Sequence, residues 1–391
     1  MGQSLLVAQS GGPTAVINAT LYGIIRECQS VGVFDRVLGV KGGFAGLRSG
    51  DWVDLLSWEE GILSRLPETP GIVLRSSRTA VSDSDLATVV ALLRSRDVHH
   101  LLFIGGNGSM LTPLRLGEEA RRQNYELLVL GLPKTIDNDL ALTDHSPGYG
   151  SAARFVARAV QDCVWDLRSL PAEPVRIIEV MGRNTGWLAA AALLARRRQE
   201  DGPCLVLTPE RTFSKQTFLT GLTHALQKYG GVVVVASEGL RTSAGTLLAE
   251  ESGFIMRDDL GRPLPGYAAG VGHVLAKLVH TELGCRVRYD KPGVLQRSAL
   301  AVSSTDRAEA ELIGREGVRA LLSGEAGKML GFVREEGPYR VRVTSFPLES
   351  VAGVERVLPD SFFIGDTLNE EMVRAYAEPL IGEPLTDYQA P

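Results

Sequence analysis

The sequence predicts an α/β protein with two Rossmann-like lobes, each a mainly parallel sheet between two layers of helices. Short apolar runs alternate with amphipathic stretches of helical length, which is the pattern of parallel strands joined by crossover helices. At 391 residues the chain is longer than one small hydrophobic core supports. No Gly/Ser-rich linker, charge block or low-complexity tract interrupts it, so we expect the two lobes to lie in close contact.

The apolar runs bounded by glycine, proline or polar loops are predicted to be strands: Leu5–Gln9, Val37–Val40, His100–Ile104, Leu127–Leu130, Arg176–Val180, Cys204–Leu207 and Val232–Ala236. The amphipathic stretches are predicted to be helices: Ala15–Gln29, Ser84–Ser95, Ser151–Leu167, Thr185–Arg197, Lys215–Tyr229, Gly270–Leu283 and Ala308–Leu322. The segment Pro147-Gly148-Tyr149-Gly150 is predicted to cross from one lobe to the other.

Composition and charge exclude several classes of partner. The formal net charge of −5 gives no general attraction to nucleic acid or to an anionic membrane, so an anionic substrate needs a local cluster of arginine and lysine. The cysteines lack paired metal-ligand spacing, which favours reduced thiols: Cys28, Cys163, Cys204 and Cys285. The apolar run after Met1 is too short for a signal peptide or a membrane span, so we expect a cytoplasmic protein.

Two glycine-rich loops follow predicted strands and precede helices. In Gln9–Thr14, Gly11 and Gly12 allow backbone amides to approach an anion at a helix N-terminus, although a tight strand-to-helix turn explains the pattern equally well. The second loop, Gly105–Ser109, follows another strand of the same predicted sheet. Because ligands of such sheets bind at the carboxyl ends of strands, two such loops favour a shared phosphate site over two unrelated turns.

The segment Pro133-Lys134-Thr135-Ile136-Asp137-Asn138-Asp139 carries the most specific chemistry. A structural turn can use Asp-Asn-Asp for capping, but such a turn does not need a neighbouring lysine. Phosphoryl transfer needs this set, because one carboxylate accepts the proton of the attacking hydroxyl while the other holds magnesium. The lysine would stabilise charge on the transferred phosphate. A fourth loop, Met181–Trp187, offers Arg183 as a forked phosphate ligand.

Taken together, the order and spacing of these loops resemble the phosphofructokinase family along nearly the whole chain. The similarity continues through Ser237-Glu238-Gly239, Arg288 and Pro292–Ser298. The resemblance implies the phosphofructokinase fold and a 6-phosphofructokinase of glycolysis, which transfers a phosphoryl group to the 1-hydroxyl of fructose 6-phosphate with Mg²⁺. It also implies a donor lobe of residues 1–148 plus about 298–350, a sugar-phosphate lobe of residues 149–297 plus about 351–391, and a homodimer or homotetramer.

The resemblance further implies roles for individual residues. Asp137 would be the catalytic base, assisted by Lys134, Thr135 and Arg183, and Asp139 with Asn107 would hold the metal. The donor would be bound by Gly11, Gly12, Arg78, Gly106, Asn107, Gly108 and Ser109. The sugar phosphate would be bound by Thr135, Asp137, Met181, Gly182, Arg183, Glu238, Arg288 and Arg297.

The residues give conflicting indications about the phosphoryl donor, ATP or pyrophosphate. Gly108 favours ATP, because the aspartate that the pyrophosphate branch usually carries there would repel the α-phosphate of a nucleotide. Lys134 and the segment Ser10–Asn18 resemble the pyrophosphate branch. Since a clash excludes a ligand more sharply than a charge attracts one, the sequence favours ATP, with pyrophosphate as the alternative.

Departures from the family pattern leave the acceptor open. Asn107 replaces an aspartate of the magnesium site, and Val294 and Pro174 stand where relatives often place ligands of the sugar 6-phosphate. A related sugar phosphate such as sedoheptulose 7-phosphate therefore stays possible. The alternatives from other classes are a catalytically silent regulatory subunit and a kinase of the NAD or diacylglycerol type.

Overall fold

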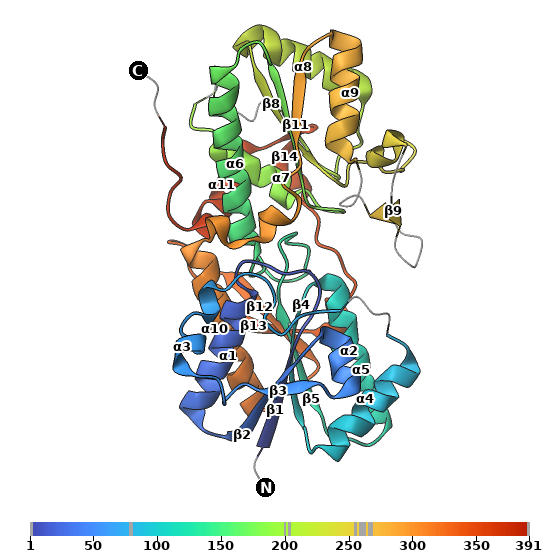
Figure 1. Cartoon of the computed structure of the whole chain (residues 1–391), viewed down its shortest axis with the longest axis vertical. Coiled ribbons are helices and arrows are strands. Elements are labelled where there is room, and N and C mark those ends of the chain that lie inside the picture. Colours follow the sequence, from blue (N-terminus) through green and yellow to red (C-terminus); the bar gives the residue numbers. More distant parts are fainter. Residues whose placement is uncertain are drawn as a thin grey trace. The chain divides into compact units, whose positions relative to one another are not determined.

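The computed structural model describes residues 3–77, 81–198, 201, 205–253, 256–257, 263–264 and 269–388. The chain forms two compact units, each with its own sheet and helices (Figure 1). Unit 1 comprises Met1–Ser151 and Arg297–Arg356, and unit 2 comprises Ala152–Gln296 and Val357–Pro391.

The sheet of unit 1 has the strand order β13-β12-β5-β4-β1-β2-β3. The five inner strands run parallel, and β3 and β13 pair antiparallel at the two edges. The strand bounds are β1 Gln3–Gln9, β2 Phe34–Val40, β3 Trp52–Asp54, β4 His100–Gly105, β5 Leu128–Pro133, β12 Lys328–Arg334 and β13 Val341–Pro347. Strands β5, β4 and β1 are neighbours, so the loops that follow them lie at one edge of the sheet.

Helices cover both faces of this sheet. Because successive side chains of a strand point to opposite faces, Leu5 and Val7 pack against α1 (Ile17–Val31) and α10 (Ser304–Leu322). Leu6 and Ala8 pack on the other side against α2 (Gly43–Ser49) and α4 (Asp83–Ser95), beside α5 (Leu111–Arg122) (Figure 1). Helices α1 and α10 meet backbone to backbone, since a Cβ on Gly23 would lie 2.2 Å from the carbonyl oxygen of Glu311.

Unit 2 repeats the arrangement with a smaller parallel sheet of order β11-β6-β8-β7. Its strands are β6 Val175–Val180, β7 Leu205–Leu207, β8 Val232–Ser237 and β11 Val287–Asp290. Helices α8 (Lys215–Tyr229) and α9 (Val271–Leu283) pack on one face, and α6 (Tyr149–Ser169) and α7 (Trp187–Ala191) pack on the other. The remaining elements are α3 Glu60–Leu63, α11 Glu370–Ala377, β9 Met256–Arg257, β10 Pro263–Leu264, β14 Phe363–Ile364 and β15 Thr367–Leu368.

The mixed α/β fold with mainly parallel sheets is confirmed, and most element ends differ from prediction by a few residues. The predicted helix Thr185–Arg197 is wrong in extent, because the α-helix ends at Ala191 and continues as 3₁₀ turns to Ala195. Strand β7 begins at Leu205, and the predicted start at Cys204 lies outside the described residues. Among those residues no helix is both long enough and apolar enough to cross a membrane.

Candidate active site

Unit 1 brings three of the predicted segments to the carboxyl edge of its sheet. Gly11 and Gly12 follow β1, the Gly106–Ser109 turn follows β4, and Lys134 to Asp139 follow β5. Arg297, from a distant segment of the chain, reaches the same place. Its Nη1 lies 2.6 Å from the position that a Cβ on Gly12 would occupy. Burial of the hydrophobic strands fixes the positions of these loops, although each loop is polar.

Lys134 is the group that joins the loops. Its Nζ donates a hydrogen bond to the carbonyl oxygen of Gly12 at 2.7 Å. Gly11 has φ +80°, a conformation that favours glycine, and a Cβ there would lie 3.0 Å from Lys134 Nζ and 3.2 Å from Ser109 Oγ. The ammonium therefore lies directly against the first glycine-rich loop.

The environment of Lys134 makes its charge titratable near neutral pH. The side chain is buried, and this loss of solvation lowers the pKa of Lys134 to about 8, against the opposing effect of Asp139 and Asp137. A buried ammonium binds an anion more strongly than an exposed one, because less water competes for it. The lysine is thus suited to hold a phosphate oxygen at this edge of the sheet.

A residue with a left-handed backbone conformation, Asn138, lies between the two aspartates of this segment. Asn138 has φ +56°, and its Oδ1 accepts a hydrogen bond from Ser146 N at 3.1 Å. Asp137 N donates to Thr135 Oγ1 at 3.1 Å, and the carbonyl oxygen of Asp139 accepts from Arg356 N at 2.8 Å. Burial raises the pKa of Asp139, and the hydrogen bond from Thr135 opposes that rise.

The oxygen atoms near this turn fit a magnesium ion. Asp139 Oδ1 and Asn107 Oδ1 are buried and have no hydrogen-bond partner among the described residues. Mg²⁺ prefers oxygen ligands and takes one or two from the protein, with the others from phosphate and water. The described residues contain no group of three or more His, Cys, Asp or Glu side chains that would hold a metal by themselves. These orphaned oxygens therefore suit a metal that arrives with a phosphate.

Sequence reasoning missed the residues that fix the 144–151 segment, which follows the aspartate pair. His145 is buried between Asp144 Oδ1, 2.8 Å from its Nδ1, and Glu309 Oε2, 2.7 Å from its Nε2. Asp306 of α10 accepts hydrogen bonds from the backbone amides of Gly148 and Ser151. The acidic residues of α10 were a signal of this role, but only the fold shows which loop they face.

Unit 2 gathers a second set of predicted residues at the ends of two neighbouring strands. Met181 and Gly182 follow β6, and Glu238 follows β8, with its amide donating to Val180 O at 2.9 Å. Ser237 Oγ donates to the carbonyl oxygen of Gly182 at 2.5 Å, and a Cβ on Gly239 would lie 1.9 Å from the carbonyl oxygen of Arg183. The loop of Arg183 is therefore packed tightly against the strand that carries Glu238.

Gln296 supports this second set, although no role at the site was predicted for it. It is buried, its Oε1 accepts from Met181 N at 2.9 Å, and its Nε2 donates to Gly293 O at 3.2 Å. A glutamine beside a basic residue gives no strong signal in one sequence, because its partners are backbone groups of distant segments.

The parallel strands, the glycine-rich loops and the aspartate pair agree with one family model, Phosphofructokinase, which matches residues 4–321. The chain belongs to the phosphofructokinase family. The match spans the glycine loops, the Lys134–Asp139 segment and the Met181–Arg183 segment alike.

The names of similar proteins within the phosphofructokinase family state the phosphoryl donor, the acceptor or both. A Xanthomonas campestris protein called pyrophosphate–fructose 6-phosphate 1-phosphotransferase is 37% identical over 388 residues, covering 97% of this chain and 91% of the relative. A sulfofructose kinase from Alkalicoccus urumqiensis is 34% identical over 360 residues, covering 91% of each protein. A solved pyrophosphate-dependent phosphofructokinase from Nitrosospira multiformis superposes with a TM-score of 0.88 at 30% identity, covering 99% of this chain and 94% of that one.

These phosphofructokinase relatives do not confirm the preference for ATP that Gly108 suggested. They fit the alternative, pyrophosphate, better. A Cβ on Gly108 would meet no atom within 4 Å, so open space at this position is compatible with either donor. Room for a nucleotide is necessary for ATP use but does not select ATP over pyrophosphate.

Two of the expected phosphofructokinase site residues lie elsewhere or outside the description. Arg288, on the edge strand β11, is exposed and forms an ion pair with Glu173, with Nη2 2.9 Å from Oε1. Arg78 lies outside the described residues. The remaining residues divide between the two sets described above, one in each unit.

Proposed function

We propose that the protein transfers a phosphoryl group from pyrophosphate to the 1-hydroxyl of fructose 6-phosphate, giving fructose 1,6-bisphosphate and inorganic phosphate. The observation that carries the proposal is the buried ammonium of Lys134 against the Gly11–Gly12 loop, beside the Asp137–Asp139 pair. A compact, highly charged donor gains most from a desolvated cation. The names of the relatives support the same donor.

In this proposal the two aspartates of the Asp137–Asp139 segment have different roles. Asp137 accepts the proton of the sugar hydroxyl, and its backbone amide is fixed by the Thr135 hydroxyl. Asp139 and Asn107 would hold a Mg²⁺ ion, which would supply positive charge to neutralise the donor phosphates. Lys134 and the loop amides of Gly11, Gly12 and Gly106–Ser109 stabilise charge on the transferred group.

The acceptor set in unit 2 comprises Met181, Gly182, Arg183 and Glu238. Its tight packing supports a preorganised site, because Gly182 has φ +122° and a Cβ there would lie 2.4 Å from the carbonyl oxygen of Thr185. Val294 is exposed and offers no hydrogen bond to a 6-phosphate. Sulfofructose, the sugar in the name of the Alkalicoccus relative, is therefore the second acceptor to test.

A matrix of initial rates tests donor and acceptor separately. Purified protein is assayed with Mg-pyrophosphate or Mg-ATP against fructose 6-phosphate, sedoheptulose 7-phosphate and sulfofructose. We expect pyrophosphate with fructose 6-phosphate to give the highest kcat/KM. Asp137→Ala should lower this kcat/KM at least about 10³-fold and leave the circular dichroism spectrum unchanged. A higher kcat/KM with ATP would overturn the donor, and a higher value with another sugar would overturn the acceptor. A folded protein inactive with every pair would support a silent subunit.

We also propose that the protein works in the cytoplasm as a homodimer or homotetramer, as the family resemblance implies. The scattered cysteines fit a reducing compartment, since Cys28 is buried and unpaired with another cysteine. Light scattering at micromolar concentration tests the assembly, and a monomeric mass with full activity would contradict it.

A further inference from the structure

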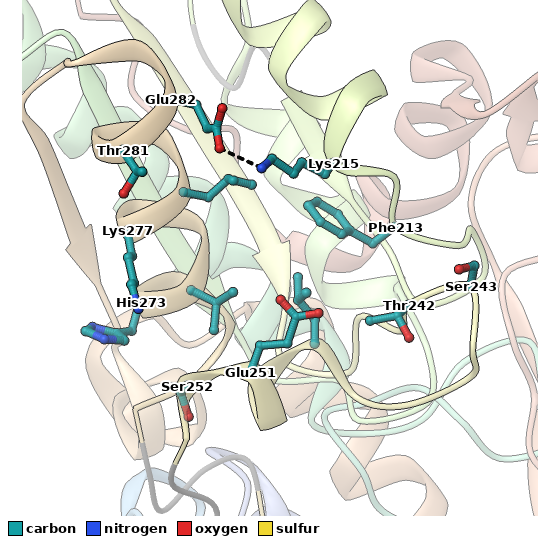
Figure 2. Close-up of a pocket in the computed structure, with 13 residues that line it drawn as sticks. Phe213, Lys215, Thr242, Ser243, Glu251, Ser252, His273, Lys277, Thr281 and Glu282 are labelled. Carbon is teal, nitrogen blue, oxygen red and sulfur yellow. Dashed lines mark hydrogen bonds and ion pairs between the residues drawn. The ribbon is translucent and has the colours of Figure 1, made fainter.

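Unit 2 contains a cavity of about 420 Å³ that is separate from the acceptor set (Figure 2). It lies among the start of α8, the face of α9 and the 241–253 segment that follows β8. Its volume is within the range of small-molecule sites in proteins. Neither the family resemblance nor the proposed reaction uses any of its lining residues.

The base of the cavity is apolar. Phe213 precedes α8, Leu248 is almost fully buried under the 248–252 turn, and Val274 and Leu278 are one helical turn apart on α9. These side chains would remove the body of an apolar ligand from water, which favours binding.

The charges of the cavity are arranged in two different ways. At one end Lys215 Nζ and Glu282 Oε1 lie 2.6 Å apart, so this lysine and this glutamate neutralise each other (Figure 2). By contrast, neither Lys277 on α9 nor Glu251 on the facing turn forms an ion pair with any residue that the structure describes. His273 lies one turn before Lys277 and lines the same wall.

Among the described residues, the cavity therefore presents a cation and an anion that lack ion-pair partners, on two different elements above an apolar base. A phosphate ester or a dicarboxylate would meet the Glu251 carboxylate, and an amine would meet the Lys277 ammonium. A molecule that carries both charges satisfies both walls. The hydroxyl groups of Thr242 and Thr281 add donors and acceptors at the rim.

We propose that this cavity binds a free α-amino acid with an apolar side chain. The carboxylate of the ligand pairs with Lys277 and His273, the ammonium group pairs with Glu251, and the side chain packs on Phe213, Leu248, Val274 and Leu278. Such a ligand leaves no charge of either wall unpaired, which is the basis of selectivity over singly charged analogues.

Isothermal titration calorimetry of the full chain with three matched probes tests the proposal. L-phenylalanine carries both charges, 3-phenylpropionate lacks the ammonium group, and phenethylamine lacks the carboxylate. We expect L-phenylalanine to bind about tenfold or more tightly than either analogue, since each lost charged hydrogen bond weakens binding by roughly that factor. Binding is measured without sugar or phosphoryl donor, so the result is independent of the proposed reaction.

Two variants test which charged side chain of the cavity pairs with which group of the ligand. Lys277→Met should weaken L-phenylalanine and 3-phenylpropionate about tenfold and leave phenethylamine unchanged, and Glu251→Gln should do the reverse. Both side chains are exposed, so neither change threatens the fold. Lys228→Met and Glu371→Gln, exposed residues outside the cavity, are the matched controls and should change nothing.

A filling variant separates this cavity from any other site. Thr281→Trp, at the exposed rim, should abolish binding of all three probes. The proposal is overturned if L-phenylalanine does not bind at a concentration of about 10 mM. A dissociation constant above that value corresponds to a binding free energy weaker than about 3 kcal/mol. It is also overturned if the three probes bind equally well, or if binding survives Thr281→Trp.

Discussion

Lys134 Nζ donates to the carbonyl oxygen of Gly12 across 2.7 Å, although 122 residues separate the two in sequence. Lys134 follows β5 and Gly12 follows β1, with β4 and its own glycine turn between the two strands in the sheet. This hydrogen bond places a cation against the first glycine loop, which would preorganise the proposed donor site.

The titration of Lys134 should limit activity at alkaline pH. Burial lowers the pKa of Lys134 to about 8, so the free enzyme loses this cation as pH rises through about 8. We expect kcat/KM for the donor to fall about tenfold per pH unit above that value, since kcat/KM reports the free enzyme. Lys134→Met should lower kcat/KM by about 10²-fold or more and should lack this alkaline limb. A wild-type profile that stays flat to about pH 10, near the ordinary lysine value, would contradict the prediction.

A methyl group at Gly11 should damage donor binding. The positive φ of Gly11 disfavours alanine, and the new Cβ would press on Lys134 Nζ at 3.0 Å. Because small displacements of a catalytic group cost rate, we expect Gly11→Ala to reduce kcat/KM for the donor by roughly 10²-fold. Gly117→Ala on α5 meets no atom within 4 Å and is the control. An equal loss in both variants would mean that crowding of Lys134 is not the cause.

Restoring a carboxylate at position 107 should strengthen magnesium binding. Asn107 Oδ1 is buried without a hydrogen-bond partner among the described residues, and Asn107→Asp adds a negative charge there. We expect the Mg²⁺ concentration for half-maximal rate to fall about tenfold, and chelation by EDTA to abolish activity of both proteins. Asn124→Asp, in the turn after α5, should leave the requirement unchanged. An unchanged or higher requirement in Asn107→Asp would remove this residue from the metal site.

The protonated His145 should stabilise the protein at neutral pH. Burial alone lowers the pKa of this imidazole, but hydrogen bonds with Asp144 and Glu309 outweigh it and raise the pKa to about 9. Because the folded-state pKa exceeds the unfolded value near 6.5, the stabilisation is complete below about pH 6.5 and is lost as pH rises through about 9.

Replacing His145 tests that linkage. His145→Leu leaves the buried Glu309 without its cation, whereas Asp144 keeps its ion pair with Arg334, and should reduce the free energy of unfolding by about 3 kcal/mol at pH near 6. Urea unfolding at about pH 6 and about pH 9.5 should show a loss of stability in the wild type that is smaller in the variant. His224→Leu, an exposed residue of α8, should behave as the wild type at both pH values. A variant with the same pH dependence as the wild type would show that another group titrates.

Local patterns in the sequence predicted the elements that carry strong periodicity. Helix α8 has the bounds Lys215–Tyr229 that the sequence predicted, because a capping serine precedes it and Gly230 in the left-handed conformation ends it. Strand β13 was missed, because its polar residues alternate at an exposed antiparallel edge and do not form an apolar run. Helix α10 begins at Ser304 and not at Ala308, because the side chain of Ser303 caps it by accepting a hydrogen bond from Asp306 N. In the sequence this cap is a weaker signal than the apolar repeat that follows it.

By itself the sequence determined the α/β class, the family, and the segments that hold the glycine loops and the Asp137–Asp139 pair. These features are local, because strand and helix periodicity and short motifs are written within a few neighbouring residues. Only the tertiary structure decided that Lys134 lies buried against Gly12, that Arg288 pairs with Glu173, and that His145 lies between two carboxylates. Burial and charge pairing depend on segments that are far apart in the chain, so no single stretch of sequence predicts them.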